Sequence, residues 1–249
     1  MKINIYTPEE INKIREGGKI TAMVIQKVLE RAVPGVTTKE LDNYATELIC
    51  AAGGNTSFAM EKGYHWATCM NVNDMVVHGI PSDYVLKEGD LLGLDLGTFY
   101  QGFHTDASWS KIINKNFNNF LSTGELALNE AIKVCKVGNR IGHISQKIQE
   151  IVEGGGYSCV KQLVGHGVGK DLHEDPEIPC YQRGNINNTC EIKEGMVLAI
   201  EIIYNEGKSP VVYNNDDGWT IVTRDGYNSG LFEHTVAIIN GRAEIMTTS

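Results

Sequence analysis

One sequence pattern occurs twice in this chain and restricts the folds that it can adopt. Residues 87–95 and residues 193–201 each begin with Lys-Glu-Gly, continue as an apolar run and end in a carboxylate, at Asp95 and Glu201 respectively. Each copy therefore predicts a turn followed by a strand. A repeat of this length, seen twice, is typical of two related half-domains rather than of a solenoid. A pseudo-twofold axis between such halves would bring Asp95 and Glu201 face to face.

Length and composition favour a single domain. The 249 residues are 42% hydrophobic, which is enough for a substantial core, and no Pro/Ser-rich linker separates the halves. We therefore expect one domain, 1–249, with an internal pseudo-repeat of roughly 1–115 and 116–249. The net charge of −9 argues against a general nucleic-acid binder, which would carry a basic face.

The sequence also indicates where the protein works. No apolar run approaches the ~18 residues of a membrane span, and the N-terminus lacks the apolar core of a signal peptide. We expect a cytoplasmic protein with no membrane partner. Its six cysteines form no Cys-x-x-Cys pair, so we expect free thiols.

Helix and strand signals come in two sets. Thr7-Pro8-Glu9-Glu10 predicts a helix that runs towards Ala32, and Thr37-Thr38-Lys39-Glu40 predicts a second helix over 38–52. Further helices are expected at 122–136 and 141–153, and strands at 67–72, 90–98, 103–113, 196–204, 219–223 and 231–239. This order predicts an α+β fold in which helices cover one face of a central, mostly antiparallel sheet. The other face is then free to carry a site.

Four acidic residues occupy positions that are unusual for exposed carboxylates. Asp95 and Asp106 flank a turn, and a hairpin there can place both side chains on one face. Glu201 and Glu233 each lie inside an apolar strand. One such acid is most often an ordinary surface residue, but four of them clustered together would repel one another. A pair of divalent cations would cancel the four charges.

Three histidines lie beside glycine or proline. His166 lies between two glycines, which leaves room for close approach and makes it a candidate nitrogen ligand. A lone histidine is usually structural, so this spacing alone is weak evidence. His78 and His173 are followed within three residues by proline. They suit proton handling better than a position in the core.

In this order, the motifs resemble those of type I methionine aminopeptidases of the pita-bread fold, metallopeptidase family M24. The resemblance covers nearly the whole chain. It implies a two-metal centre with five ligands: Asp95, Asp106, His166, Glu201 and Glu233. By the same resemblance, Asp106 and Glu233 bridge the metals, Asp95 completes one of them, and His166 with Glu201 completes the other.

The resemblance also implies the catalytic roles. A hydroxide shared by the two metals attacks the first peptide bond, and Glu201 accepts the proton of the attacking water. His173 corresponds to the family histidine that binds the scissile carbonyl and its oxyanion, and His78 to the one that contacts the peptide nitrogen. Three residues match positions around the bound methionine side chain: Tyr64, Cys69 and Trp219. The alternative for the last two is packing in the core.

The sequence departs from the family pattern near the substrate. Leu172 replaces the usual aromatic residue before the second histidine, and Ile202 replaces the proline that usually follows the glutamate ligand. The segment 61–66 is also unusual. We expect the metal chemistry to be intact and the fine substrate preference to differ.

The function implied is that of a methionyl aminopeptidase, which removes N-terminal methionine when the second residue is small. The ligand set contains no thiolate and suits Co, Mn or Fe at least as well as Zn. The expected partners are nascent peptide N-termini, with the ribosome as a candidate meeting place, and the expected oligomeric state is a monomer.

Two alternatives stay open on the sequence, and a third is excluded. A prolidase or aminopeptidase P shares the metal ligands but is usually longer, with an added N-terminal domain. A type II methionine aminopeptidase would need a helical insertion for which the segment between His173 and Glu201 is too short. A non-catalytic binding protein on this fold would typically lack some of the ligands, and all five are present here.

Overall fold

The structure is a computed structural model that describes residues 3–214 and 217–248. The α-helices within these ranges are α1 (Pro8–Arg31), α2 (Thr38–Ala51), α3 (Asn119–Val134) and α4 (Ile141–Gly154), and the 3₁₀ helices are η1 (Phe58–Met60) and η2 (Ile186–Asn188). The strands are β1 (Asn55–Thr56), β2 (Thr68–Val72), β3 (Met75–Val77), β4 (Leu91–Tyr100), β5 (Phe103–Ile112), β6 (Ser158–Cys159), β7 (Val164–Gly167), β8 (Glu174–Pro179), β9 (Val197–Asn205), β10 (Val211–Tyr213), β11 (Ile221–Thr223), β12 (Ser229–Ile239) and β13 (Arg242–Ile245). In the part of the chain described, no helix is both long and apolar enough to cross a membrane.

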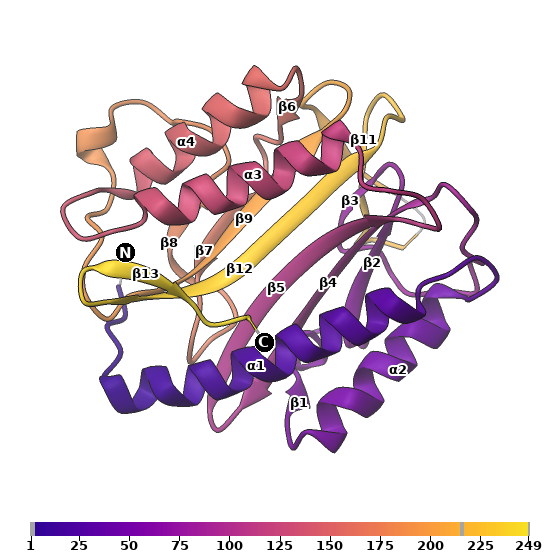
Figure 1. Ribbon diagram of the computed structural model, residues 1–249, viewed down its shortest axis with the longest axis horizontal. Helices are drawn as coiled ribbons and strands as arrows, with labels where there is room; N and C mark the ends of the chain where they lie inside the picture. Colours follow the sequence, from indigo (N-terminus) through magenta and orange to yellow (C-terminus); the bar gives the residue numbers. More distant parts are fainter. Residues whose placement is uncertain (1–2, 215–216, 249) are drawn as a thin grey trace.

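Two sheets make up the β structure. The ten-stranded sheet has the order β1-β4-β5-β12-β9-β7-β8, with β2 beside β4, β6 beside β9 and β13 beside β12. A smaller sheet has the order β10-β11-β3. The four α-helices lie on one face of the large sheet: α1 packs against β4 and β5, α2 against β1 and β2, α3 against β9 and β12, and α4 against β6 and β8 (Figure 1). The predicted α+β arrangement, with helices on one face of an antiparallel sheet, is confirmed.

The strand order around the centre of the large sheet has a symmetrical form. The hairpin β4–β5 meets the pair β12–β9, and one long helix packs on each pair, α1 on the first and α3 on the second. This order is compatible with halves of roughly 1–115 and 116–249. The single domain 1–249 and the duplication stay predictions.

The first two helices begin where the sequence predicts. The Thr7 hydroxyl accepts from the Glu10 backbone N–H, and the Glu10 carboxylate accepts from the Thr7 N–H. Thr37 and Glu40 form the same reciprocal pair at the start of α2. Each pair satisfies two N–H groups that a helix start otherwise leaves free.

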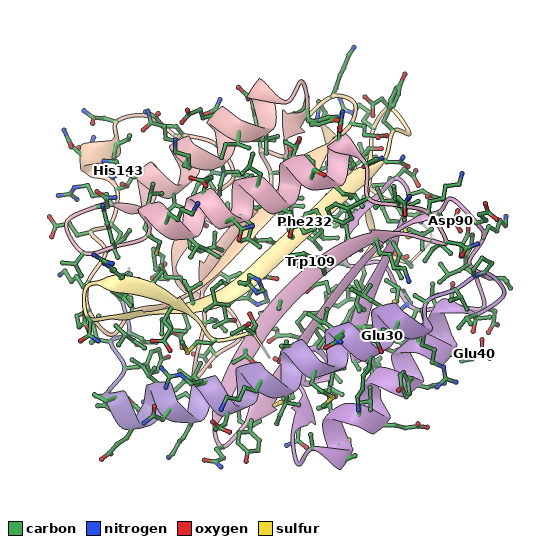
Figure 2. The ribbon with its side chains drawn as sticks, viewed as in Figure 1. Glu30, Glu40, Asp90, Trp109, His143 and Phe232 are labelled. Carbon is green, nitrogen blue, oxygen red and sulfur yellow. The ribbon has the colours of Figure 1, made fainter. Side chains whose placement is uncertain are left out.

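Strand alternation separates the core from the site. Trp109 on β5 and Phe232 on β12 lie side by side on the helix-covered face, with ring centroids 5.0 Å apart (Figure 2). Successive strand residues project to opposite faces, so Ser108 and Glu233 face the other way. The apolar residues of the two central strands therefore pack under the helices, while their polar neighbours line the uncovered face.

The two halves of the sheet meet at a short seam between β5 and β12, where only two residue pairs are in register. On one side of the seam, the Ser110 hydroxyl donates to the Leu231 carbonyl and accepts from the Leu231 N–H, both at 2.9 Å. On the other side, the Thr235 hydroxyl donates to the Asp106 carbonyl at 2.7 Å and accepts from the Asp106 N–H at 2.9 Å. Hydroxyl groups thus replace the backbone ladder where the strands separate.

One predicted strand begins later than expected. Trp219 was expected in a strand over 219–223, but it precedes β11, because Asp217 Oδ1 accepts from the backbone N–H groups of both Trp219 and Thr220. A carboxylate that binds two successive amides favours a turn over an extended chain. The other predicted elements agree with the structure to within a few residues.

Candidate active site

A single row of paired residues crosses the uncovered face of the sheet. Cys69 pairs with Asp95, Asp95 with Ser108, Ser108 with Glu233, and Glu233 with Glu201, so the row runs through β2, β4, β5, β12 and β9. Residues that pair across adjacent strands project to the same face. The row therefore places three of the four predicted carboxylates side by side.

The remaining two predicted ligands join this row from neighbouring positions. Asp106 lies two residues before Ser108 on β5 and shares its face. His166 on β7 pairs with Ala199, two residues before Glu201. The five side chains thus come from five different strands and share one face of the sheet.

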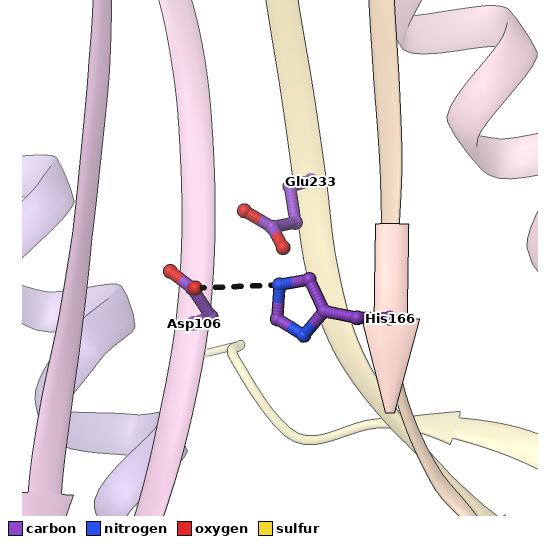
Figure 3. Close-up of side chains that lie close together, drawn as sticks. All are labelled: Asp106, His166 and Glu233. Atoms are coloured by element: carbon purple, nitrogen blue, oxygen red, sulfur yellow. Dashed lines mark ion pairs between the residues drawn. The ribbon is translucent and has the colours of Figure 1, made fainter. Parts of the chain in front are cut away.

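Three of these residues form a compact group. Asp106, His166 and Glu233 each offer one ligand atom, and the three atoms lie within 4.8 Å of one another. His166 Nε2 is 3.9 Å from Asp106 Oδ2, and the Glu233 carboxylate points towards the same space (Figure 3). Asp95 and Glu201 lie beside this group, and together with Asp106 and His166 they line one cavity. Their coordination of a metal, like that of the other three, stays a prediction.

Burial and mutual repulsion disfavour the charged forms of the carboxyl groups. Burial raises the pKa of Asp106 to about 7, and burial with the nearby Asp106 charge raises the pKa of Glu201 to about 8. The pKa values of Asp95 and Glu233 lie well above the usual range for the same two reasons. Burial lowers the pKa of His166 to about 3, so its imidazole is neutral and able to coordinate a cation.

Within the described part of the chain, three of the carboxylate oxygens also lack hydrogen-bond donors. Asp95 Oδ1, Asp106 Oδ1 and Glu233 Oε1 are buried and have no hydrogen-bond partner among the described residues. Buried polar atoms without a partner are costly, because they lose their hydration and gain nothing in return. Four carboxylates and one imidazole form a donor set that suits divalent cations such as Mn, Fe, Co and Zn. The residues present therefore fit a metal centre.

Both predicted catalytic histidines lie at the edge of this group. The rings of His166 and His173 are 4.5 Å apart between centroids. His78 follows β3 with a φ of 58°, a conformation uncommon for residues other than glycine, and its ring meets the edge of Trp219 at 6.2 Å. Both histidines line the cavity that contains the carboxylates.

The cavity has a volume of about 320 Å³ and one apolar wall. The wall is a buried cluster that contains Phe58, Tyr64, Cys69 and Leu172, with Trp219 packed against it. The predicted pocket residues Tyr64, Cys69 and Trp219 all line the cavity, and so does Leu172. Their contact with a substrate stays a prediction. A soft, aromatic-walled slot of this kind suits a thioether side chain.

An acidic residue on α2 holds this wall in place. Asp42 Oδ1 accepts from the backbone N–H groups of Ala67 and Thr68 and from the Thr68 hydroxyl, at 2.9 to 3.0 Å. The Tyr64 hydroxyl in turn donates to the Thr68 carbonyl at 2.9 Å and lies 3.4 Å from the Cys69 sulfur. Sequence analysis did not identify Asp42, because nothing in its helix distinguishes it from a surface acid.

The other four histidines do not line the cavity. His104 is buried and bonds Ser57 at 2.5 Å, and His234 bonds Thr247 at 2.9 Å. His143 accepts from the Arg140 N–H at the start of α4, and His65 is exposed. All six cysteines are free. Sequence analysis did not identify Phe58 and Leu163 as cavity residues, since they carry no motif.

Comparison with known proteins agrees with this geometry. Residues 12–240 match the metallopeptidase family M24. The chain belongs to metallopeptidase family M24. Methionine aminopeptidase 1 of Bacillus subtilis is 41% identical over 244 residues, which are 97% of each chain. The predicted family, a metallopeptidase with aminopeptidase relatives, is thus confirmed.

Solved structures of the family share the fold. The crystal structure of methionine aminopeptidase from Thermotoga maritima superposes with a TM-score of 0.95 at 39% identity and covers 100% of both chains. A prolidase from Pyrococcus furiosus gives a TM-score of 0.78 at 22% identity and is matched over only 65% of its length. The second likeness shows the fold alone. The predicted pita-bread fold is confirmed.

Proposed function

We propose that this chain is a metal-dependent aminopeptidase that removes N-terminal methionine from polypeptides whose second residue is small. The observation that carries the proposal is a cavity of about 320 Å³ with one apolar wall, which four of the five ligand-type side chains line, while the fifth, Glu233, is grouped with Asp106 and His166. The methionine aminopeptidases of Bacillus subtilis and Thermotoga maritima, matched over nearly the whole chain, support it.

Two divalent ions fit the carboxylate cluster. Asp95, Asp106, Glu201 and Glu233 bring four negative charges, and His166 brings a neutral nitrogen. When bound, the ions supply Lewis acidity that polarises the scissile carbonyl and acidifies the attacking water. Cobalt, manganese, iron and zinc are the candidate metals, since all accept carboxylate and imidazole ligands.

Three side chains around the cavity have separate roles in the reaction. Glu201, partly exposed in the cavity, accepts the proton of the attacking water. His173 donates a hydrogen bond to the carbonyl oxygen as negative charge develops on it. His78 contacts the peptide nitrogen on the leaving side, where its left-handed backbone conformation directs the ring into the cavity.

The apolar wall selects the first residue of the substrate. Tyr64, Cys69 and Trp219 form a slot that accepts methionine and rejects a charged side chain, because an unpaired charge is costly to bury. A charged first residue would also lie close to the aromatic edges of Tyr64 and Trp219, whose centroids are 5.2 Å apart. Small second residues are expected because the ligand cluster borders the slot on its other side.

Proline-specific peptidases are the main enzymatic alternative. Prolidases and aminopeptidase P share the metal ligands, and the Pyrococcus furiosus prolidase shares the fold. The higher identity to the methionine aminopeptidases, 41% and 39% against 22% for the prolidase, argues against that activity here. A non-catalytic binding protein is disfavoured, because all five ligand-type residues and both histidines are present.

The cellular setting belongs to the same proposal. A methionine-removing enzyme meets its substrates as new chains emerge, so we place the protein in the cytoplasm with nascent peptide N-termini as partners and the ribosome as the meeting place. We propose that it acts as a monomer. The net charge of −9 disfavours direct binding to nucleic acid.

Peptide hydrolysis tests the proposed function. Purified protein, stripped of metal and reloaded separately with Mn, Fe, Co or Zn, is assayed on Met-Ala-Ser, Met-Leu-Ser and Ala-Pro-Ser. We expect kcat/KM for Met-Ala-Ser to exceed the other two by at least ~100-fold with the preferred metal. Faster cleavage of Ala-Pro-Ser would favour a proline-specific peptidase, and no cleavage with any metal would favour the binding protein.

Metal removal should make stability depend on pH. The unfolded carboxyl groups titrate near pH 4, but the folded pKa values of Asp106 and Glu201 are raised to about 7 and 8. Between about pH 4 and 8 the unfolded state therefore binds fewer protons, and the free energy of unfolding of the chelated protein falls as pH rises. We expect its melting temperature to drop on the order of 5–10 °C between pH 5.5 and 8.5.

The metal-loaded protein is the comparison for this measurement. Excess Mn²⁺ binds the folded carboxylates and should remove most of the decrease in melting temperature by differential scanning calorimetry. An identical pH profile with and without metal, together with no heat of binding in a calorimetric titration, would contradict a metal centre at these residues.

The Leu172 position offers a test of the cavity wall. Leu172 is 3% exposed and packs in the cluster with Tyr64 and Cys69. Leu172→Phe adds ring surface to the slot and should raise the preference for Met-Ala-Ser over norleucyl-Ala-Ser and Leu-Ala-Ser, in kcat/KM, by about three- to tenfold. The control is Leu126→Phe on α3, where the side chain is 51% exposed. Unchanged ratios in Leu172→Phe would show that residue 172 does not contact the substrate.

A further inference from the structure

The N-terminal segment lies against the loop that carries His173. Ile3 forms a parallel bridge with Asp175, and the Tyr6 backbone N–H donates to the Gly195 carbonyl at 2.8 Å. This places the Tyr6 ring, only 4% exposed, beneath the loop between β7 and β8. The segment therefore packs over a part of the chain that lies more than 160 residues further along.

The Tyr6 hydroxyl makes two hydrogen bonds to that loop. It donates to Glu174 Oε1 at 2.6 Å and accepts from the Lys170 backbone N–H at 3.0 Å. The same Glu174 oxygen also accepts from the Asp171 N–H at 3.1 Å. Burial and the Glu174 carboxylate raise the pKa of Tyr6 above its ordinary value, so the hydroxyl keeps its proton. One buried phenol thus ties together both ends of the turn that contains His173.

The Tyr6 ring packs tightly against Gly169. A Cβ atom at Gly169 would lie 2.1 Å from the Tyr6 oxygen, so glycine is the only residue that fits there without displacing the ring. The Gly169 carbonyl accepts from the His104 N–H at 2.6 Å, which ties the loop to β5 as well. On the outside, the Lys170 ammonium lies 3.1 Å from Glu10 at the start of α1.

The packing of the 169–174 turn affects the orientation of His173. Its neighbours Leu172 and Glu174 are fixed, the first in the apolar wall and the second on the Tyr6 hydroxyl. The His173 ring itself has no hydrogen bond that orients it among the described contacts, and it meets His166 only through ring packing. Its backbone placement therefore depends on its neighbours, and Glu174 is held both by pairing with Gly167 and by the Tyr6 hydroxyl.

Resting on the proposed function, we propose that Tyr6 is a positioning residue that acts through Glu174 and the 169–174 turn to hold His173 at the scissile carbonyl. Without the hydroxyl, the half-buried Glu174 carboxylate loses its shortest hydrogen bond and the turn can relax away from the cavity. A displacement of about 1 Å at a group that stabilises a transition state can cost up to ~100-fold in rate. The ground-state complex depends on the apolar wall instead, so substrate binding is little affected.

A double-mutant cycle tests this inference on the full-length, metal-loaded protein. The variants are Tyr6→Phe, His173→Ala and the double variant, with kcat and KM measured for Met-Ala-Ser. We expect Tyr6→Phe to lower kcat about tenfold, with KM changed less than about twofold. In the His173→Ala background we expect Tyr6→Phe to change kcat by less than about twofold, because the group that it positions is gone. Tyr227→Phe, at a ring that is 60% exposed, is the matched control and should keep full activity.

A second pair of variants tests the connection from the other side. Glu174→Ala removes the acceptor and should show the same dependence on His173, whereas Glu174→Gln keeps an amide oxygen at that place and should lose less kcat than Glu174→Ala. This pair keeps the test available should Tyr6→Phe fail to fold.

The outcomes separate this inference from the proposed function. Full kcat in Tyr6→Phe, or an equal fall in both backgrounds, would overturn the inference, since an equal fall signals a general structural defect. Full kcat in His173→Ala would overturn the role of His173 in the proposed function and this inference with it. A fall in His173→Ala with none in Tyr6→Phe would overturn the inference alone.

Discussion

Glu201→Gln is expected to lower kcat for Met-Ala-Ser by about 10³-fold or more. The substitution keeps the size of the side chain but removes a negative charge from the ligand cluster and the basic oxygen that accepts the proton of water. Because Glu201 pairs with Glu233 across β9 and β12, the loss also changes the charge balance at a second predicted ligand. Steady-state kinetics with saturating metal measure the effect, and calorimetry gives the number of metal ions retained.

The control for this variant is the same chemical change at a neighbouring strand. Glu177 on β8 is exposed and pairs with Arg183 at 3.4 Å, so Glu177→Gln should leave kcat within about twofold of the parent. A kcat in Glu201→Gln within tenfold of the parent would show that another group takes the proton.

His173→Ala is expected to lower kcat by about 10²–10³-fold, with little change in KM. The imidazole stabilises the oxygen only when negative charge develops on it, so its loss affects the transition state more than the bound peptide. His143→Ala is the matched control. His143 lies on α4, does not line the cavity, and accepts a hydrogen bond from the Arg140 backbone N–H. The substitution should lower stability slightly and leave kcat unchanged. Equal kcat in His173→Ala and the parent would mean that the oxyanion is held elsewhere.

The sequence was sufficient to predict features that depend on local chemistry. The capping boxes at Thr7 and Thr37 contain both partners within four residues, and each helix begins where they predict. The position of Asp95 and Asp106 on one face follows from strand alternation and a short turn. The repeat of Lys-Glu-Gly and an acid-ending strand located Glu201 on β9, directly beside Glu233.

Features that depend on distant pairs could not be predicted. Asp42 looks like a surface acid in its helix, and only the folded chain brings the amides of Ala67 and Thr68 to its carboxylate. Tyr6 and Glu174 are separated by 168 residues, and no pattern in either segment refers to the other. Trp219 was placed in a strand because it begins the strand-like run Trp-Thr-Ile-Val-Thr, while Asp217 turns the chain there.

The pairing of β5 with β12 determines when, during synthesis, the ligand-type residues come together. Asp106 and Thr235, whose backbone and hydroxyl groups close the seam, are 129 residues apart, so loop closure between them comes late and is entropically costly. During synthesis the hairpin β4–β5 emerges with only two of the four carboxylates, Asp95 and Asp106, so it meets only part of the repulsion. The full cluster of negative charge forms when β12, near the end of the chain, docks against it. Docking of β12 therefore adds repulsion among the buried carboxylates, and we expect divalent cations to favour this last step of folding by offsetting it.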